Sequence, residues 1–168
     1  MKQHENMTII FLQIIIITLL FTWMCFATTG GNNTAQIHNY PPEIQEEYFK
    51  THEFIETEPL SKRVIANKSF ALLVFAALFI LMAYLAGART FSQGFFYGLF
   101  MMIWIAGYDT FFMDWVLFAN MKRFRLEGTE HMDDAYHQKW FHLKGILFPG
   151  SLYAIIVALM TGLVISML

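Results

Sequence analysis

The sequence predicts an all-α polytopic membrane protein with four transmembrane helices and one or two amphipathic or interfacial helices on the cytoplasmic side. Composition gives the first reason, because 57% of the 168 residues are hydrophobic and only 14% are charged. Soluble domains carry about 25% charged residues, so this chain lacks the polar side chains that would cover a soluble surface. The second reason is the presence of four apolar segments of about the 20 residues that cross a bilayer. Because lipid cannot satisfy backbone N–H and C=O groups, each segment is expected to be helical.

The four spans are expected to form a single membrane domain over residues 1–168. A short hairpin joins the middle pair, with Gly87 able to end one helix and Ser92 able to start the next, so these helices should be antiparallel neighbours. Pro149 lies one turn into the fourth span and is expected to kink it. The expected spans are residues 7–28, 69–88, 94–120 and 145–168, joined by cytoplasmic segments at 29–68 and 121–144.

Positive residues are distributed unevenly between the two sides of the membrane. Nine of the eleven Lys and Arg residues lie in the two long connections, and only Lys2 and Arg89 lie on the other side. An excess of Lys and Arg marks the cytoplasmic side. We therefore expect a multi-pass protein of the plasma (inner) membrane with both termini outside the cytoplasm. A cleaved signal peptide is the alternative for the first span, but its weakly charged leader and long apolar stretch argue against it.

Each long connection is expected to contain a helix. Pro41, Pro42 and Glu43 are typical of a helix start, and Ile44 and Tyr48 follow at near-helical spacing. This amphipathic helix is acidic, which disfavours binding to anionic lipid and favours docking on the other connection. In that connection we expect a helix from residue 130 to about 144 that continues into the fourth span.

Asp109 is the most informative residue because it lies near the middle of the third span. An ionised carboxylate there costs roughly 2.5–3.5 kcal/mol on insertion scales, so it should face protein or water. Asp114 lies five positions later, about 140° further around an α-helix, and should not share a narrow stripe with Asp109. With Tyr108, these residues form a candidate proton- or ion-binding site. The structural alternative is a protonated or paired aspartate that joins helices, with Arg89 or Lys144 reaching one end.

A second candidate site lies in the connection before the fourth span. On a helix, Glu130, Asp133, Asp134 and His137 fall at spacings of three and four. Carboxylates and neutral histidine are ligands for zinc, manganese or iron, so the group is a candidate metal site. The ordinary alternative is a solvated acidic helix with i,i+4 charge pairs.

Two further features have ordinary explanations. Lys122, Arg123 and Arg125 follow the third span and are candidates for binding lipid phosphate or an anionic substrate, although a topology anchor is the simpler interpretation. Gly94 and Gly98 lie four residues apart, which is typical of close helix packing, and dimerisation through them is an alternative.

Three function classes stay open, and no catalytic residue can be named. We rank first a non-catalytic accessory or structural subunit of a homo- or hetero-oligomer, whose loops bind a partner through Tyr48 or Phe49. The second is a small oligomeric proton- or cation-linked transporter or channel that uses Asp109. The third is a membrane-surface metal-binding protein or metalloenzyme that uses Asp133, Asp134 and His137.

Composition also limits the cofactors and partners. A divalent metal is the one candidate cofactor, and no haem is expected because the four spans contain no histidine. A single cysteine excludes an intrachain disulfide. The net charge of −2 gives no basis for binding nucleic acid. The expected partners are the lipid bilayer and either further copies of the chain or a larger membrane complex.

Overall fold

The computed structural model describes residues 2–28, 37–54 and 62–168, and this part of the chain is helical without strands. It contains four helices long and apolar enough to cross a membrane, which confirms the predicted fold class. Their bounds are Glu5–Ala27, Ile65–Leu85, Phe91–Phe118 and Asp133–Met167, and in the last of these a turn at His137 separates Asp133–Tyr136 from the rest. The elements that build them are α1 (Lys2–Thr28), α3 (Lys62–Leu85), α4 (Phe91–Tyr108) with η2 (Asp109–Phe118), and α6 (Lys139–Gly145) with η4 (Ile146–Gly150) and α7 (Ser151–Met167).

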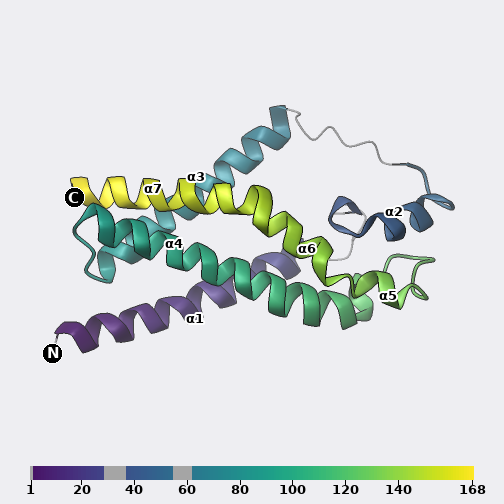
Figure 1. The fold of residues 1–168 in the computed structure, drawn as a ribbon, viewed down its shortest axis with the longest axis horizontal. Helices are drawn as coiled ribbons and strands as arrows, with labels where there is room; N and C mark the ends of the chain where they lie inside the picture. Colours follow the sequence, from purple (N-terminus) through teal and green to yellow (C-terminus); the bar gives the residue numbers. More distant parts are fainter. Residues whose placement is uncertain (1, 29–36, 55–61) are drawn as a thin grey trace.

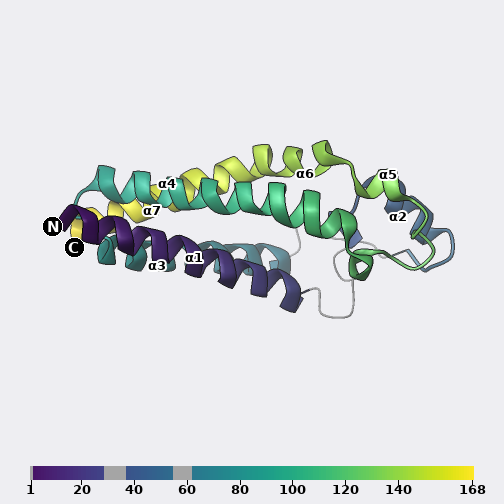
Figure 2. The ribbon, with the colours of Figure 1, turned by 90° about the horizontal axis from the view of Figure 1, so that it is seen from below.

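Helices α1, α4 and α7 run along one another, α3 crosses α7 obliquely, and the polar elements gather at one end of the bundle (Figures 1 and 2). The start of α1, the α3–α4 hairpin and the end of α7 lie at the opposite end. Gly87 has φ +90° in this hairpin, a conformation that glycine adopts without steric cost. Thr90 rather than Ser92 caps the next helix, because the Thr90 hydroxyl accepts the Gln93 N–H.

Helices α4 and α7 approach each other so closely that only glycine fits at several positions of the contact. A Cβ on Gly94 would lie 2.9 Å from the Thr161 carbonyl oxygen and 3.0 Å from the Gly162 Cα. A Cβ on Gly98 would meet Thr161 Oγ1 at 3.0 Å. The face of α4 that carries Gly94 and Gly98 is therefore covered by α7 of the same chain, and the alternative of dimerisation through these glycines is wrong.

Helix α1 packs on the bundle through Ile17 and through polar side chains, and most of its side chains face away from the bundle. Gln13 is buried and joins three helices, because its amide donates to the Met82 carbonyl at 2.9 Å and accepts from the Tyr97 hydroxyl at 2.7 Å. One turn further, the Trp104 indole donates to Thr18 Oγ1 at 2.9 Å. Hydrogen bonds between helices stabilise packing in hydrocarbon, so these contacts add to the apolar packing that holds α1.

The two long connections pack on each other, as their patterns predicted. Helix α2 (Pro42–Phe49) buries Ile44 and Tyr48 against a small core to which Leu126 and Tyr136 contribute from the other connection. The Tyr136 hydroxyl accepts the Leu126 N–H at 2.9 Å, which fixes the turn between them.

The expectation of one helix from residue 130 to 144 is wrong. Only Asp133–Tyr136 (α5) is helical before a turn at His137, which has φ −94° and ψ 16°. The reason is that Tyr136 is buried in the core with α2, whereas α6 must follow η2 into the bundle. The chain therefore changes direction between α5 and α6.

Candidate functional site

The third span changes its winding at Asp109. From Asp109 to Phe118 the backbone forms the π-helix η2, and at its end the Ala119 N–H donates to the Asp114 carbonyl, five residues earlier. This pattern places more residues in each turn than the roughly 3.6 of an α-helix. Backbone groups keep their partners, so lipid tolerates the change. Turns of this kind are frequent at functional sites.

The wider winding brings Asp109 and Asp114 to the wall of one cavity. The expectation that they would not share a face came from an α-helical wheel, on which they differ by about 140°, and it is wrong for this segment. A looser helix moves position i+5 back toward position i. One continuous wall therefore carries both carboxylates.

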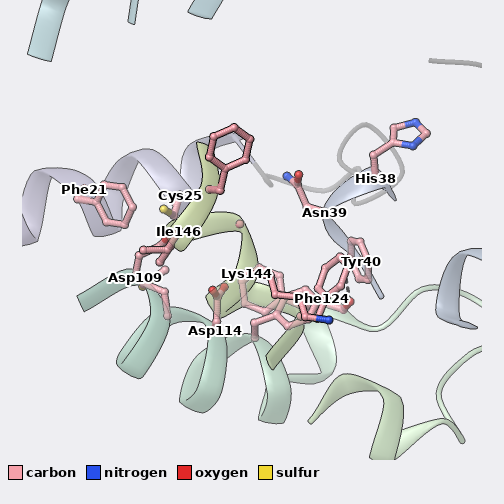
Figure 3. Close-up of a pocket in the computed structure, with 15 residues that line it drawn as sticks. Phe21, Cys25, His38, Asn39, Tyr40, Asp109, Asp114, Phe124, Lys144 and Ile146 are labelled. Atoms are coloured by element: carbon pink, nitrogen blue, oxygen red, sulfur yellow. Dashed lines mark hydrogen bonds between the residues drawn. The ribbon is translucent and has the colours of Figure 1, made fainter. Parts of the chain in front are cut away.

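The cavity has a volume of about 750 Å³ and lies between three parts of the bundle (Figure 3). The C-terminal half of α1 forms one side, η2 forms another, and α6 with η4 forms the third. The segment at 38–40 lies at the polar end of the cavity. The lining residues are Phe21, Cys25, His38, Asn39, Tyr40, Asp109, Met113, Asp114, Phe118, Phe124, Phe141, Lys144, Gly145, Ile146 and Phe148.

The charged side chains are spread along the cavity rather than gathered at one point. Asp109 lies beside Cys25 and Ile146, and Asp114 lies toward Lys144 (Figure 3). His38 lies far from both carboxylates at the polar end. Lys144 was expected as one possible partner for an aspartate, and it is on the cavity wall, whereas Arg89 lies in the hairpin at the opposite end of the bundle.

Asp109 faces the cavity without a protein partner. Within residues 2–28, 37–54 and 62–168, its carboxylate makes no salt bridge and no hydrogen bond. Ionisable groups inside spans usually pair or face a water-filled cavity. The position of Asp109 on the cavity wall fits the second of these cases.

Tyr108, the third member of the predicted ion site, is directed elsewhere. Its hydroxyl shares a hydrogen bond of 2.8 Å with Thr22 Oγ1, and its ring stacks on Phe112 at 5.2 Å. It does not line the cavity. Its contact joins α1 to the third span and so helps to position the wall that carries Asp109.

Sequence reasoning missed Cys25 and the aromatic side chains that line the cavity. The sequence shows Cys25 only as a single cysteine that excludes an intrachain disulfide, whereas in the structure it lines the cavity together with Asp109. Six lining side chains are aromatic, and they come from α1, η2, the loops and the α6–η4 segment. No spacing along one helix reveals such a set, because its members meet only through tertiary packing.

Tyr40 closes the polar end of the cavity as a neutral hydrogen-bond donor. Its hydroxyl donates to the Phe124 carbonyl at 2.9 Å. Burial, and to a lesser degree the neighbouring Tyr136, raises the pKa of Tyr40 above its usual range. This hydroxyl therefore contributes no negative charge to the site.

The four predicted metal ligands are not brought together. Asp133 accepts a hydrogen bond from Arg125 Nη2 at 2.6 Å, and His137 Nδ1 lies 3.6 Å from its second carboxylate oxygen. Glu130 and Asp134 are exposed. Among the side chains that the structure describes, no group of three or more His, Cys, Asp or Glu is placed to hold a metal ion.

Two members of the predicted basic site make contacts within the chain. Arg123 donates to the Phe26 carbonyl at 3.0 Å and so holds the end of α1. Arg125 donates to the Ala119 carbonyl at 2.8 Å and covers the ring of Tyr136 at 3.9 Å. Lys122 is exposed beside them. These contacts support a structural role for the cluster.

No protein-family model matches the chain, and neither a curated protein nor a solved structure is significantly similar to it. Its function must therefore be argued from the cavity and the residues around it.

Proposed function

We propose that this protein binds a proton or another cation in the cavity and is a small cation-linked transporter or channel. Asp109 and Asp114 supply the carboxylates. The observation that carries the proposal is that η2 places both of them on the wall of one open cavity inside a transmembrane segment. Placing a carboxylate in a transmembrane span costs free energy, and carboxylates that line a cavity there commonly mark ion pathways.

Flux into liposomes tests this proposal. Purified protein is reconstituted, a potassium gradient or a proton gradient is imposed, and the decay of each gradient is followed with a fluorescent indicator. We expect Asp109→Asn to abolish the protein-dependent flux, because it removes the charge that faces the cavity. Asp134→Asn is the matched control, since it makes the same chemical change on an exposed residue outside the cavity.

The variants must also assemble, so gel filtration and thermal stability are measured on each. Loss of flux with unchanged assembly supports the proposal. Flux that is equal in the wild type, Asp109→Asn and Asp114→Asn excludes these carboxylates as the binding groups. It would leave the accessory or structural subunit as the better interpretation.

The accessory role needs a different test from the one that the sequence suggested. Tyr48 is buried and Phe49 is half-buried against it, so substituting either would disturb the loop core itself. Phe54 is 73% exposed and offers a better probe of a partner surface. Co-purification of a defined protein that Phe54→Ala reduces would support this second interpretation.

We also propose that the polar end of the bundle, which carries α2 and α5, faces the cytoplasm. The support is the excess of Lys and Arg in the two segments that meet there. A tag fused after Leu168 should then be accessible from outside intact cells, and accessibility only after permeabilisation would reverse the orientation.

A further inference from the structure

We infer that the ligand of this cavity is a monovalent organic cation with an apolar body, such as a hydrophobic amine or a quaternary ammonium. The inference deepens the proposed function and depends on it, because it names the class of cation that Asp109 and Asp114 receive. Size, wall chemistry and charge each favour this class over an inorganic ion.

The size of the cavity is the first argument. Its volume is about 750 Å³, whereas one water molecule occupies roughly 30 Å³ in the liquid. Sites for small organic molecules have volumes of about 300–1,000 Å³. A bare or partly hydrated metal ion would fill only a small part of this space and would need a tight group of ligands. The described residues supply no group of three or more His, Cys, Asp or Glu for that purpose.

The chemistry of the wall is the second argument. Aromatic rings come from every side of the cavity, with Phe21 from α1, Phe118 from η2 and Phe141 from α6. The face of an aromatic ring attracts an ammonium group, and recognition of quaternary ammonium compounds commonly uses several such rings. The same rings bury the apolar part of a ligand. An inorganic ion would gain little from them.

The balance of charge is the third argument. Asp109, Asp114 and Lys144 line the cavity, and His38 lies apart at its polar end (Figure 3). At their formal charges, these three side chains give the wall one negative charge in excess. A ligand with one positive charge neutralises this excess, whereas a divalent ion would leave the cavity with a net positive charge. Lys144 therefore opposes the ligand, and removing its charge should strengthen binding.

Cys25 provides a built-in reporter for this proposal, because it is the only cysteine of the chain and lines the cavity with Asp109. The full-length protein in nanodiscs is treated with two methanethiosulfonates of similar size. One carries a trimethylammonium group and the other a sulfonate. The ratio of their rates at Cys25 measures the charge that a small organic ion meets in the cavity.

We expect the cationic reagent to react faster in the wild type, and the rate ratio to fall at least about tenfold in the Asp109→Asn, Asp114→Asn double variant. One pair of unit charges about 10 Å apart at an effective dielectric constant of about 20 already changes a rate by more than about tenfold, and the ratio contains several such pairs, so this value is a lower bound. Lys144→Gln should raise the ratio, and Asp134→Asn should leave it unchanged. Opposite shifts for the two cavity variants would not arise from a general loss of structure.

Ligand protection then identifies the class of cation. Benzyltrimethylammonium should slow the reaction of Cys25 with N-ethylmaleimide several-fold. Neopentylbenzene is its uncharged analogue of the same shape and should not protect. Tetramethylammonium lacks the ring and should protect more weakly, and potassium should not protect at matched ionic strength.

The outcomes separate this inference from the proposed function. If potassium or proton flux depends on Asp109 but benzyltrimethylammonium gives no protection, the organic cation is wrong and the cation site stands. If protection by neopentylbenzene equals that by benzyltrimethylammonium, the cavity binds apolar molecules without regard to charge, and the inference is overturned. If neither flux nor the rate ratio depends on the two carboxylates, both proposals fail.

Discussion

The contact between α4 and α7 gives a stability prediction whose size follows from the structure. In Gly94→Ala the new methyl group would lie 2.9 Å from both the Thr161 carbonyl oxygen and the Ile165 Cβ. Ordinary van der Waals contacts of a Cβ begin near 3.4 Å. The two helices must therefore separate by several tenths of an ångström. No flexible side-chain end is available to move instead, because the neighbours are backbone atoms and a Cβ.

The clash should lower the free energy of unfolding by an amount at the upper end of the range for overpacking, which is about 1–3 kcal/mol. Replacing glycine by alanine inside a helix also stabilises it by about 1 kcal/mol, so the net loss should be near 2 kcal/mol. Gly107→Ala is the matched control in the same helix, because its methyl group would meet only the Phe111 ring, at 3.9 Å. That variant should gain the helix propensity without the clash. The free energies of unfolding of the two variants should differ by about 3 kcal/mol, which is the cost of the clash alone.

Thermal stability in detergent, followed by the loss of the monodisperse gel-filtration peak, measures this difference. A change of 1 kcal/mol shifts the midpoint by about 2–4 °C in chains of 150–250 residues, so the two variants should differ by about 6–12 °C. Equal midpoints for Gly94→Ala and Gly107→Ala would refute the packing of α4 on α7 through this face.

Two further predictions concern hydrogen bonds of buried tyrosines. Tyr97→Phe removes the donor to Gln13 and should lower the free energy of unfolding by about 0.5–2 kcal/mol, because hydrogen bonds between transmembrane helices have this strength. The same thermal assay measures this loss, and an unchanged midpoint would contradict the Gln13–Tyr97 contact. Tyr136→Phe leaves the Leu126 N–H without its acceptor and removes one of the two hydrogen bonds of the Thr129 hydroxyl, which should cost about 1–3 kcal/mol locally. Limited trypsin digestion should then cut the 121–138 segment faster while the spans stay intact, and an identical digestion pattern would count against this role.

Much of the architecture could be predicted because membrane insertion depends on local composition. The four spans follow from apolar runs that each stand alone in the sequence. The docking of the two polar segments was also predictable, since the acidity around Ile44 and Tyr48 left a protein surface as the better partner for their apolar face. Both predictions needed only the pattern within one segment.

The site could be predicted only in part, because its geometry depends on how segments meet. Asp109 was found by its cost in lipid, but its alignment with Asp114 depends on the π-helical hydrogen bonds of η2, which a periodicity of about 3.6 residues does not reveal. Cys25 and Lys144 lie in different elements, and only the folded bundle places them on one wall. The prediction of a continuous helix over 130–144 was wrong for a similar reason, because burial of Tyr136 in the loop core overrides the helical pattern.

The irregular backbone and the carboxylates around this cavity require the same environment. On one side η2 departs from α-helical winding, and on the other Phe148 has φ −155° and ψ 122° before Pro149, which interrupts the fourth span as its sequence predicted. The Ser151 hydroxyl donates to the Leu147 carbonyl at 2.6 Å and so supplies a donor at this break. Non-helical backbone at membrane depth is tolerated where it is buried in protein or lines a water-filled cavity. Regular continuation of α4 and α7 beyond their glycine contact would keep the two helices close and leave no such space. Asp109 and Phe148 both line the cavity, so water that enters it would reach the carboxylate and the break in the helix together.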